Sequence, residues 1–345
     1  MGPRGRIAGF LRAHPVVCLL LLSPGIPEYL SGSSPFSALV LNPGMFLFQI
    51  IANLGLYGPG VLLVREAKVR WNKGWATVLL LGAAYGILEE GVALSTLFDP
   101  AANPVGVLGV YGHWLGVNWV WLAGILPVHM IYSISIPILL LGLVLPETNG
   151  RSFLGGRKLP VAIGILGVDV AALFALIVFG LKFWMGWPVL LGSLVAIALL
   201  AVAAGRARPD VLHARTEEPT IGPKWSAALG AAFYPSVLAT EFVGRGLGVP
   251  ASADFVLVVL VQAFFLLLAL KVLGAERNRR NITGFTFGLI LPIAAFGVIS
   301  QASLPLVLVA DVVMFMFFRK LWGPSASAGG VGTRREGGTL LPPVP

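Results

Sequence analysis

Charged residues are scarce in this sequence. Asp, Glu, Lys and Arg make up 11% of its 345 residues, whereas 57% are apolar. A soluble domain carries about 25% charged residues, because its surface must face water. The scarcity of charge therefore excludes a soluble globular enzyme, a nucleic-acid-binding domain and a disordered chain. What remains is an all-α fold, a polytopic integral membrane bundle of helices.

Cysteine is also scarce, and the common catalytic signatures are missing. The single cysteine, Cys18, excludes an intrachain disulfide. The sequence has no P-loop, no Gly-x-Ser-x-Gly, no His-Glu-x-x-His and no zinc-type Cys/His spacing, so we do not expect nucleotide-driven pumping by this chain alone. Ala, Gly, Val and Leu dominate the composition, and Arg outnumbers Lys, which favours a GC-rich prokaryotic genome as the source.

Long apolar runs predict about ten transmembrane helices within residues 1–322. A helix needs about 20 residues to cross about 30 Å of hydrocarbon, and most of these runs are close to that length. The expected spans are 8–23, 43–64, 75–97, 116–145, 160–180, 188–204, 225–243, 255–273, 282–300 and 304–318. The first could instead be a cleaved signal peptide, which would leave nine spans, but no Ala-x-Ala cleavage pattern follows it. The Gly/Pro/Ser-rich residues 323–345 predict a disordered cytoplasmic tail.

The positions of the basic residues predict the orientation. The net charge is +9, and if the ten spans alternate from a cytoplasmic N-terminus, 22 of the 24 Lys and Arg fall on the cytoplasmic side. Only Lys182 and Arg245 do not. We therefore expect a multi-pass protein of the cell membrane with cytoplasmic N- and C-termini, whose partner is the lipid bilayer and not nucleic acid. The outer loops 24–42 and 98–115 are rich in Gly, Pro and aromatic residues, and we expect them to fold back onto the membrane or cap a cavity.

Ionisable residues within the spans are few, and each needs a reason because burial in lipid costs several kcal/mol. They are Glu89, Glu90, His129, Asp169, Glu241 and Asp311. Glu89 shares a helical face with Gly82 and Gly86, a small-residue pattern that lets another helix approach closely. We expect that face to look into the bundle, with Glu90 on its border.

His129 lies on the next long span, between Pro127 and Pro137. Helical spacing places it on one stripe with Asn118 and Ser133. The two prolines remove backbone hydrogen bonds and favour a kinked helix around the histidine. We predict that Glu89, Glu90 and His129 converge in the outer half of the membrane as candidate catalytic residues. Asn118 and Ser133 would support them, and the outer loops would bring Glu28, Asp99 and His113 nearby.

Structural roles explain several of these residues equally well. A lone histidine in a membrane helix is often bonded to a backbone carbonyl, and Ser133 can bond back to its own helix. Glu241 and Arg245 are spaced i, i+4, which favours a structural ion pair. Asp169 and Asp311 are single acids that can hold helices together.

Glu89-Glu90 followed by His129 on the next predicted helix resembles the CAAX-type (CPBP) intramembrane protease family. That family's pattern is Glu-Glu-x-x-x-Arg, then Phe-x-x-x-His, then a later His-x-x-x-Asn/Asp. Here Leu94 stands at the arginine position and Ile125 at the phenylalanine position, and the only later histidine is His213, in a basic loop. The resemblance covers about 45 of the 345 residues. It implies a membrane-embedded protease, for which His113 would substitute as the third group and a divalent metal would be one option as cofactor.

Three functions follow from these residues. In the first, the chain is a membrane-embedded hydrolase or transferase that acts on a lipid or a membrane peptide. Glu90 or Glu89 would be the base, and His129 a second acid–base group or metal ligand. In the second, the chain is a proton-coupled transporter of a small molecule that uses the same carboxylates. In the third, it is a non-catalytic membrane subunit whose acids hold helices together.

Overall fold

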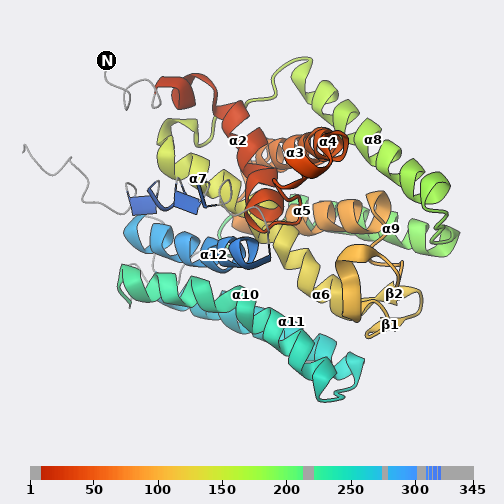
Figure 1. Ribbon diagram of the computed structural model, residues 1–345. Helices are drawn as coiled ribbons and strands as arrows, with labels where there is room; N and C mark the ends of the chain where they lie inside the picture. Colours follow the sequence, from red (N-terminus) through yellow and green to blue (C-terminus); the bar gives the residue numbers. More distant parts are fainter. Residues whose placement is uncertain are drawn as a thin grey trace, which may run out of the picture.

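The computed structural model describes residues 9–212, 221–273 and 279–300, together with 308, 309, 311, 312, 314–316, 318 and 319. The predicted tail 323–345 and His213 lie outside these residues, and the predicted span 304–318 is described only in part. Where the chain is described, it is almost entirely helical (Figure 1). The helices of the first third are α2 (Pro15–Pro24), η1 (Gly25–Leu30), α3 (Ala38–Leu41), α4 (Pro43–Arg70), α5 (Trp75–Gly86) and η2 (Ile87–Ala93).

A loop region separates these helices from the rest. It contains the 3₁₀ segment η3 (Asn103–Leu108) and the two-residue strands β1 (His113–Trp114) and β2 (Val117–Asn118), which pair antiparallel. Leu115 and Gly116 connect the strands, and both have positive φ, as a tight two-residue hairpin turn requires. The later helices are α6 (Trp119–Pro127), η4 (Val128–Ser135), α7 (Ile136–Val144), η5 (Pro146–Thr148), α8 (Lys158–Ala175), η6 (Leu176–Gly180), α9 (Trp187–Arg206), α10 (Pro223–Gly246), α11 (Ala251–Val272) and α12 (Arg279–Ser300).

Eight of the described helices are long and apolar enough to cross a membrane. Three of them run through π-helical segments without a break, namely α5–η2, α6–η4–α7 and α8–η6. The chain is therefore an all-α membrane bundle, as its composition predicts. The shorter apolar helix Pro15–Leu30 continues seven residues past the predicted end of the first span, so η1 is helical where we expected the outer loop.

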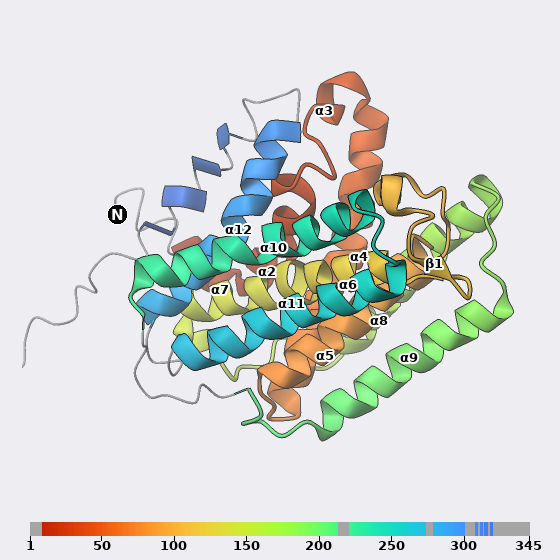
Figure 2. The same ribbon diagram turned by 90° about the horizontal axis from the view of Figure 1, so that it is seen from below.

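The helices α5–η2 and α6–η4–α7 form the centre of the bundle. About two thirds of their apolar windows are buried, against 11% for α8–η6 and α9, whose side chains are available to lipid. Figure 1 shows α8 at one side of the molecule and α10 and α11 at the opposite side, with α5 and α6 between them. Figure 2 shows α9 at one edge and α12 towards the opposite edge, with α5, α6 and α7 between them. Two apolar clusters flank α6–η4–α7, one built on Ile134 and Ile138 and the other on Tyr132 and Ile136.

A buried polar cluster anchors the end of α4 beyond the predicted span. Arg65 donates hydrogen bonds to the carbonyls of Arg151 and Thr148, at 3.0 and 2.5 Å. Glu66 accepts hydrogen bonds from the backbone amides of Phe153 and Leu154. These backbone groups satisfy the charges of Arg65 and Glu66 inside the protein, so α4 can continue past residue 64. The same hydrogen bonds hold α4 to the loop before α8.

Candidate functional site

Glu89 and Glu90 occupy a π-helical turn at the end of the α5–η2 span. The backbone amide of Leu94 bonds to the carbonyl of Glu89 at 2.9 Å, five residues back, which is the spacing of a π-helix. This wider turn carries both carboxylates to the side that faces η4. Leu94, at the position of the family's arginine, ends this segment.

The small-residue face of α5 packs directly against η4, as predicted. A Cβ atom at Gly82 would lie 2.9 Å from Cα of Met130, and one at Gly86 would lie 3.1 Å from Cβ of His129. The first distance is shorter than real Cβ contacts, and the second is tighter than most of them, so glycine at both positions favours the close approach of the two backbones. This close approach places His129 opposite the two carboxylates.

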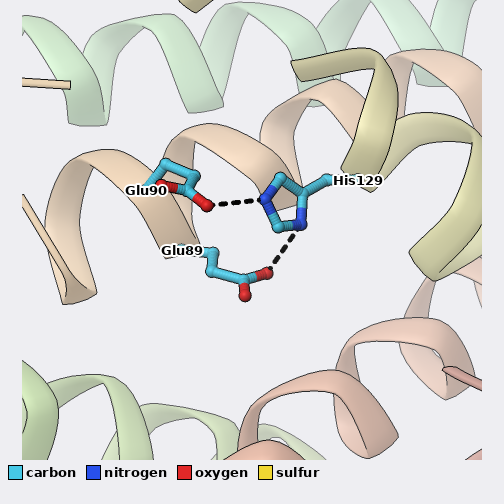
Figure 3. A group of neighbouring side chains, drawn as sticks. All are labelled: Glu89, Glu90 and His129. Atoms are coloured by element: carbon cyan, nitrogen blue, oxygen red, sulfur yellow. Dashed lines mark hydrogen bonds and ion pairs between the residues drawn. The ribbon is translucent and has the colours of Figure 1, made fainter. Parts of the chain in front are cut away.

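His129 bridges the two glutamates (Figure 3). Its Nδ1 lies 3.0 Å from Oε2 of Glu89, and its Nε2 lies 2.9 Å from Oε1 of Glu90. All three side chains are buried, with exposed fractions of 1%, 7% and 2% for Glu89, Glu90 and His129. The predicted convergence of these residues is therefore present in the structure.

Neighbouring hydroxyl groups hold the bridged residues. Thr96 donates a hydrogen bond to Oε2 of Glu90, and the indole nitrogen of Trp121 donates to the Thr96 hydroxyl at 3.3 Å. Ser133, predicted as a supporting residue, has its Oγ 3.3 Å from Nδ1 of His129. These contacts restrict the rotamers of Glu90 and His129, so the site is preorganised.

Two tyrosine rings and a third carboxylate complete the surroundings. The rings of Tyr57 and Tyr85 lie 6.2 and 6.0 Å from the ring of His129. The hydroxyl of Tyr57 donates a 2.6 Å hydrogen bond to Oε1 of Glu28, which lies in η1. Glu28 is close enough to interact electrostatically with Glu89 and His129. Sequence reasoning placed Glu28 only near the site and gave no signal for Tyr57.

The other predicted supporting residues lie elsewhere. His113 is in β1, where its Nε2 lies 3.0 Å from the carbonyl oxygen of Phe98, and it does not join His129. Asn118 is buried, but its side chain caps α6 by accepting from the amide of Trp121 and bonds the loop carbonyls of Leu108 and Gly109. Among the described residues, neither side chain forms a hydrogen bond to Glu89, Glu90 or His129. These polar side chains satisfy the backbone of the 94–118 loop instead.

The predicted ion pair between Glu241 and Arg245 is also wrong. Glu241 is buried and turned towards Gly124 of α6, whereas the side chain of Arg245 is exposed. The i, i+4 spacing allows such a pair but does not require it, and Glu241 points into the bundle. Asp99 accepts a hydrogen bond from the backbone amide of Ala101 in its own turn, and this hydrogen bond is exposed.

Glu89, Glu90 and His129 can together hold a metal ion. One ligand atom from each lies within 4.8 Å of the others, and histidine nitrogen and carboxylate oxygen are both atoms that zinc binds. Among the described residues, no other group of three or more such side chains meets this spacing. The residues present thus fit a divalent metal.

The sequence matches no family model, and neither a curated protein nor a solved structure matches it significantly. The chemistry of the site must therefore be inferred from its own residues.

Proposed function

We propose that the chain is a membrane-embedded hydrolase that cleaves an ester or amide bond in a lipid or a membrane peptide. The observation that carries this proposal is the contact of one buried imidazole with two buried carboxylates. An imidazole between carboxylates can take up or release a proton on either side, which a general acid–base catalyst must do. The resemblance of the Glu-Glu and histidine motifs to the CAAX-type proteases supports the same chemistry.

In this proposal Glu90 is the base and Glu89 the positioning residue. Glu90 removes a proton from water, and the oxygen of that water attacks the carbonyl carbon of the substrate. Glu90 passes this proton to Nε2 of His129, 2.9 Å from its Oε1. The bond from carbon to the leaving oxygen or nitrogen then breaks as His129 gives the proton to the leaving group, so an acid and an alcohol or amine are released and both residues return to their starting states. Glu89 holds Nδ1 of His129 and so orients the ring.

A divalent metal ion, when bound by Glu89, Glu90 and His129, would polarise the substrate carbonyl and make bound water more acidic. Thr96 and Ser133 would then orient the ligand side chains through their hydrogen bonds to Glu90 and His129.

The test is turnover by the purified protein in liposomes, with a panel of lipid esters and quenched-fluorescent transmembrane peptides. We expect Glu90→Gln and His129→Ala to reduce turnover by about 100-fold or more, the usual contribution of a general acid–base group. Glu147→Gln, which changes an exposed acid, is the matched control. Full turnover by a folded His129→Ala variant would exclude histidine chemistry and with it this proposal.

A second function, proton-coupled transport, is favoured by Asp169. This acid lies in a cleft of about 450 Å³ between α4 and α8 and interacts electrostatically with Glu89. Asp169 and Glu89 would be successive proton sites of a permease. The test is solute flux in proteoliposomes under a pH gradient, which Glu89→Gln and Asp169→Asn should uncouple. Unchanged flux in both variants would reject transport.

For the topology we propose ten spans in the cell membrane with both termini cytoplasmic. The eight long helices, the helix Pro15–Leu30 and the predicted span 304–318 make up this number, and the distribution of Lys and Arg supports the orientation. On a Cys18→Ala background, Leu115→Cys should react with an impermeant maleimide added to intact cells, and Gly155→Cys should not. The reverse labelling pattern would show that the orientation in the membrane is opposite to the one proposed.

A further inference from the structure

A second pair of buried acids lies away from the candidate active site. Glu241 is near the end of α10 and Asp254 is in the first turn of α11, and residues 247–250 join the two helices. Their exposed fractions are 2% and 0%. Figure 1 shows α10 and α11 side by side, with α6 next to their joined ends. The carboxylate of Asp254 lies against Gly244, three residues after Glu241 on α10.

These acids have unusually few partners. Within the described part of the chain, Oε1 of Glu241 and both carboxylate oxygens of Asp254 accept no hydrogen bond. The cation nearest in sequence, Arg245, has an exposed side chain and forms no ion pair with either acid. Buried charges are normally paired or bound to a metal, because an isolated charge is costly to remove from water. Among the described residues, the pair therefore has no cationic partner.

Two glycines make room for the carboxylates at the contact of α6, α10 and α11. A Cβ atom at Gly124 of α6 would lie 2.0 Å from Oε1 of Glu241. A Cβ atom at Gly244 of α10 would lie 2.5 Å from Oδ1 of Asp254. Both carboxylates therefore point into the bundle, against helix backbone, and neither is turned towards solvent.

The 94–118 loop supplies a further oxygen and a cover. The hydroxyl of Tyr111 donates to the carbonyl of Val249 at 2.9 Å and interacts with Asp254. The Tyr111 hydroxyl oxygen keeps lone pairs and can therefore also act as an acceptor or ligand. The rings of Trp114 and Trp119 pack on Phe255 at 6.3 and 6.1 Å, beside Asp254 in the chain.

We propose that Glu241 and Asp254 bind a divalent cation of the oxygen-preferring class, Mg²⁺ or Ca²⁺. Two carboxylates supply a charge that matches such an ion, and all the donors present are oxygens, which these ions prefer. The ion would join α10 and α11 to α6 and the 94–118 loop. It would be structurally distinct from the Glu89–Glu90–His129 site, which contains a nitrogen donor.

The test is thermal unfolding of the full-length protein, stripped with EDTA in an uncharged detergent. CaCl2 and MgCl2 are then titrated separately, with NaCl at matched ionic strength as the control. We expect at least one divalent ion to raise the Tm with a saturable dependence, because an ion that binds only the folded state stabilises it. Asp254→Asn and Glu241→Gln should each weaken the apparent affinity at least tenfold, and Glu147→Gln should not change it.

The Glu90→Gln variant separates the two sites. If the ion binds at Glu241 and Asp254, Glu90→Gln keeps the rise in Tm. A rise that Glu90→Gln abolishes, or that persists in the Glu241→Gln/Asp254→Asn double variant, would overturn the assignment. If neither ion raises the Tm of the native sequence, the assignment is overturned too. The two acids would then be neutralised by protonation.

Discussion

The bundle contains two groups of buried acids that differ in what faces them. Glu89 and Glu90 face a histidine, and Glu90 also accepts a hydrogen bond from Thr96. Glu241 and Asp254 face helix backbone at two glycines, and three of their four oxygens have no hydrogen-bond partner among the described residues. The first group has a protein partner in His129, although Oε2 of Glu89 makes only the ion-pair contact and accepts no hydrogen bond. The second group has no cationic partner among the described residues.

The largest expected effect comes from removing the histidine that faces Glu89 and Glu90, which leaves these acids without a cationic partner. His129→Ala leaves two adjacent carboxylates buried without their common partner. Removing one partner of a buried ion pair typically costs about 3 to 5 kcal/mol of stability. We expect His129→Ala to lower the free energy of unfolding by this amount, measured in a mild detergent titrated with SDS. Adding Glu89→Gln should recover part of the loss, since it removes one of the two charges. No recovery would show that the ring contributes packing only.

The next effect concerns Glu28, the third acid near the histidine. Tyr57→Phe removes the hydroxyl that donates to Glu28 at 2.6 Å and leaves Ser34 as its remaining side-chain donor. A hydrogen bond to a charged group contributes about 1.5 to 3 kcal/mol, so the free energy of unfolding should fall by that amount. Tyr29→Phe is the matched control, because its hydroxyl only accepts a weak 3.4 Å contact from Asn53. Equal effects of the two variants would contradict a special role for Tyr57.

Much of the first group could be predicted from the sequence, because its signals are local. Gly82 and Gly86 mark the face of α5 that another helix approaches, and Glu89 follows on that face. The scarcity of charge also makes each intramembrane acid stand out. Helical periodicity therefore predicts which side chains turn inward and which helices come close.

The remaining features depend on departures from regular helix geometry. Glu28, Glu89 and His129 all lie in π-helical segments, whose wider turn has no sequence signature. The prolines and glycine near Glu28 are typical of a loop, yet the chain there continues as a helix because it is packed in the bundle. Asp254 lies just before the expected start of its span, so the sequence pattern does not predict that it is buried. Whether Glu241 pairs with Arg245 depends on how α10 is rotated, which one helix cannot reveal.

The second group provides the reverse test. In EDTA, the double variant Glu241→Gln/Asp254→Asn should be more stable than the native sequence by about 1 to 3 kcal/mol, because it removes two poorly compensated buried charges. The corresponding double variant Glu89→Gln/Glu90→Gln should be less stable, because it weakens both contacts with His129. The measurement is again the free energy of unfolding. The same sign for both double variants would mean that the two groups do not differ as described.

The smallest expected effect tests whether the two groups are coupled. Asn118 caps α6 and donates a 2.7 Å hydrogen bond to the loop carbonyl of Leu108. It therefore connects the 94–118 loop, which contains Tyr111, to α6, which contains the Trp121 that donates to Thr96. Asn118→Ala should cost about 1 kcal/mol, the usual effect of losing an N-cap. Asn42→Ala, which removes the exposed N-cap of α4, is the control. If the loop couples the groups, Asn118→Ala should lower both turnover and the affinity for the divalent ion, and Asn42→Ala neither. A loss of stability alone would show that each group works independently of the other.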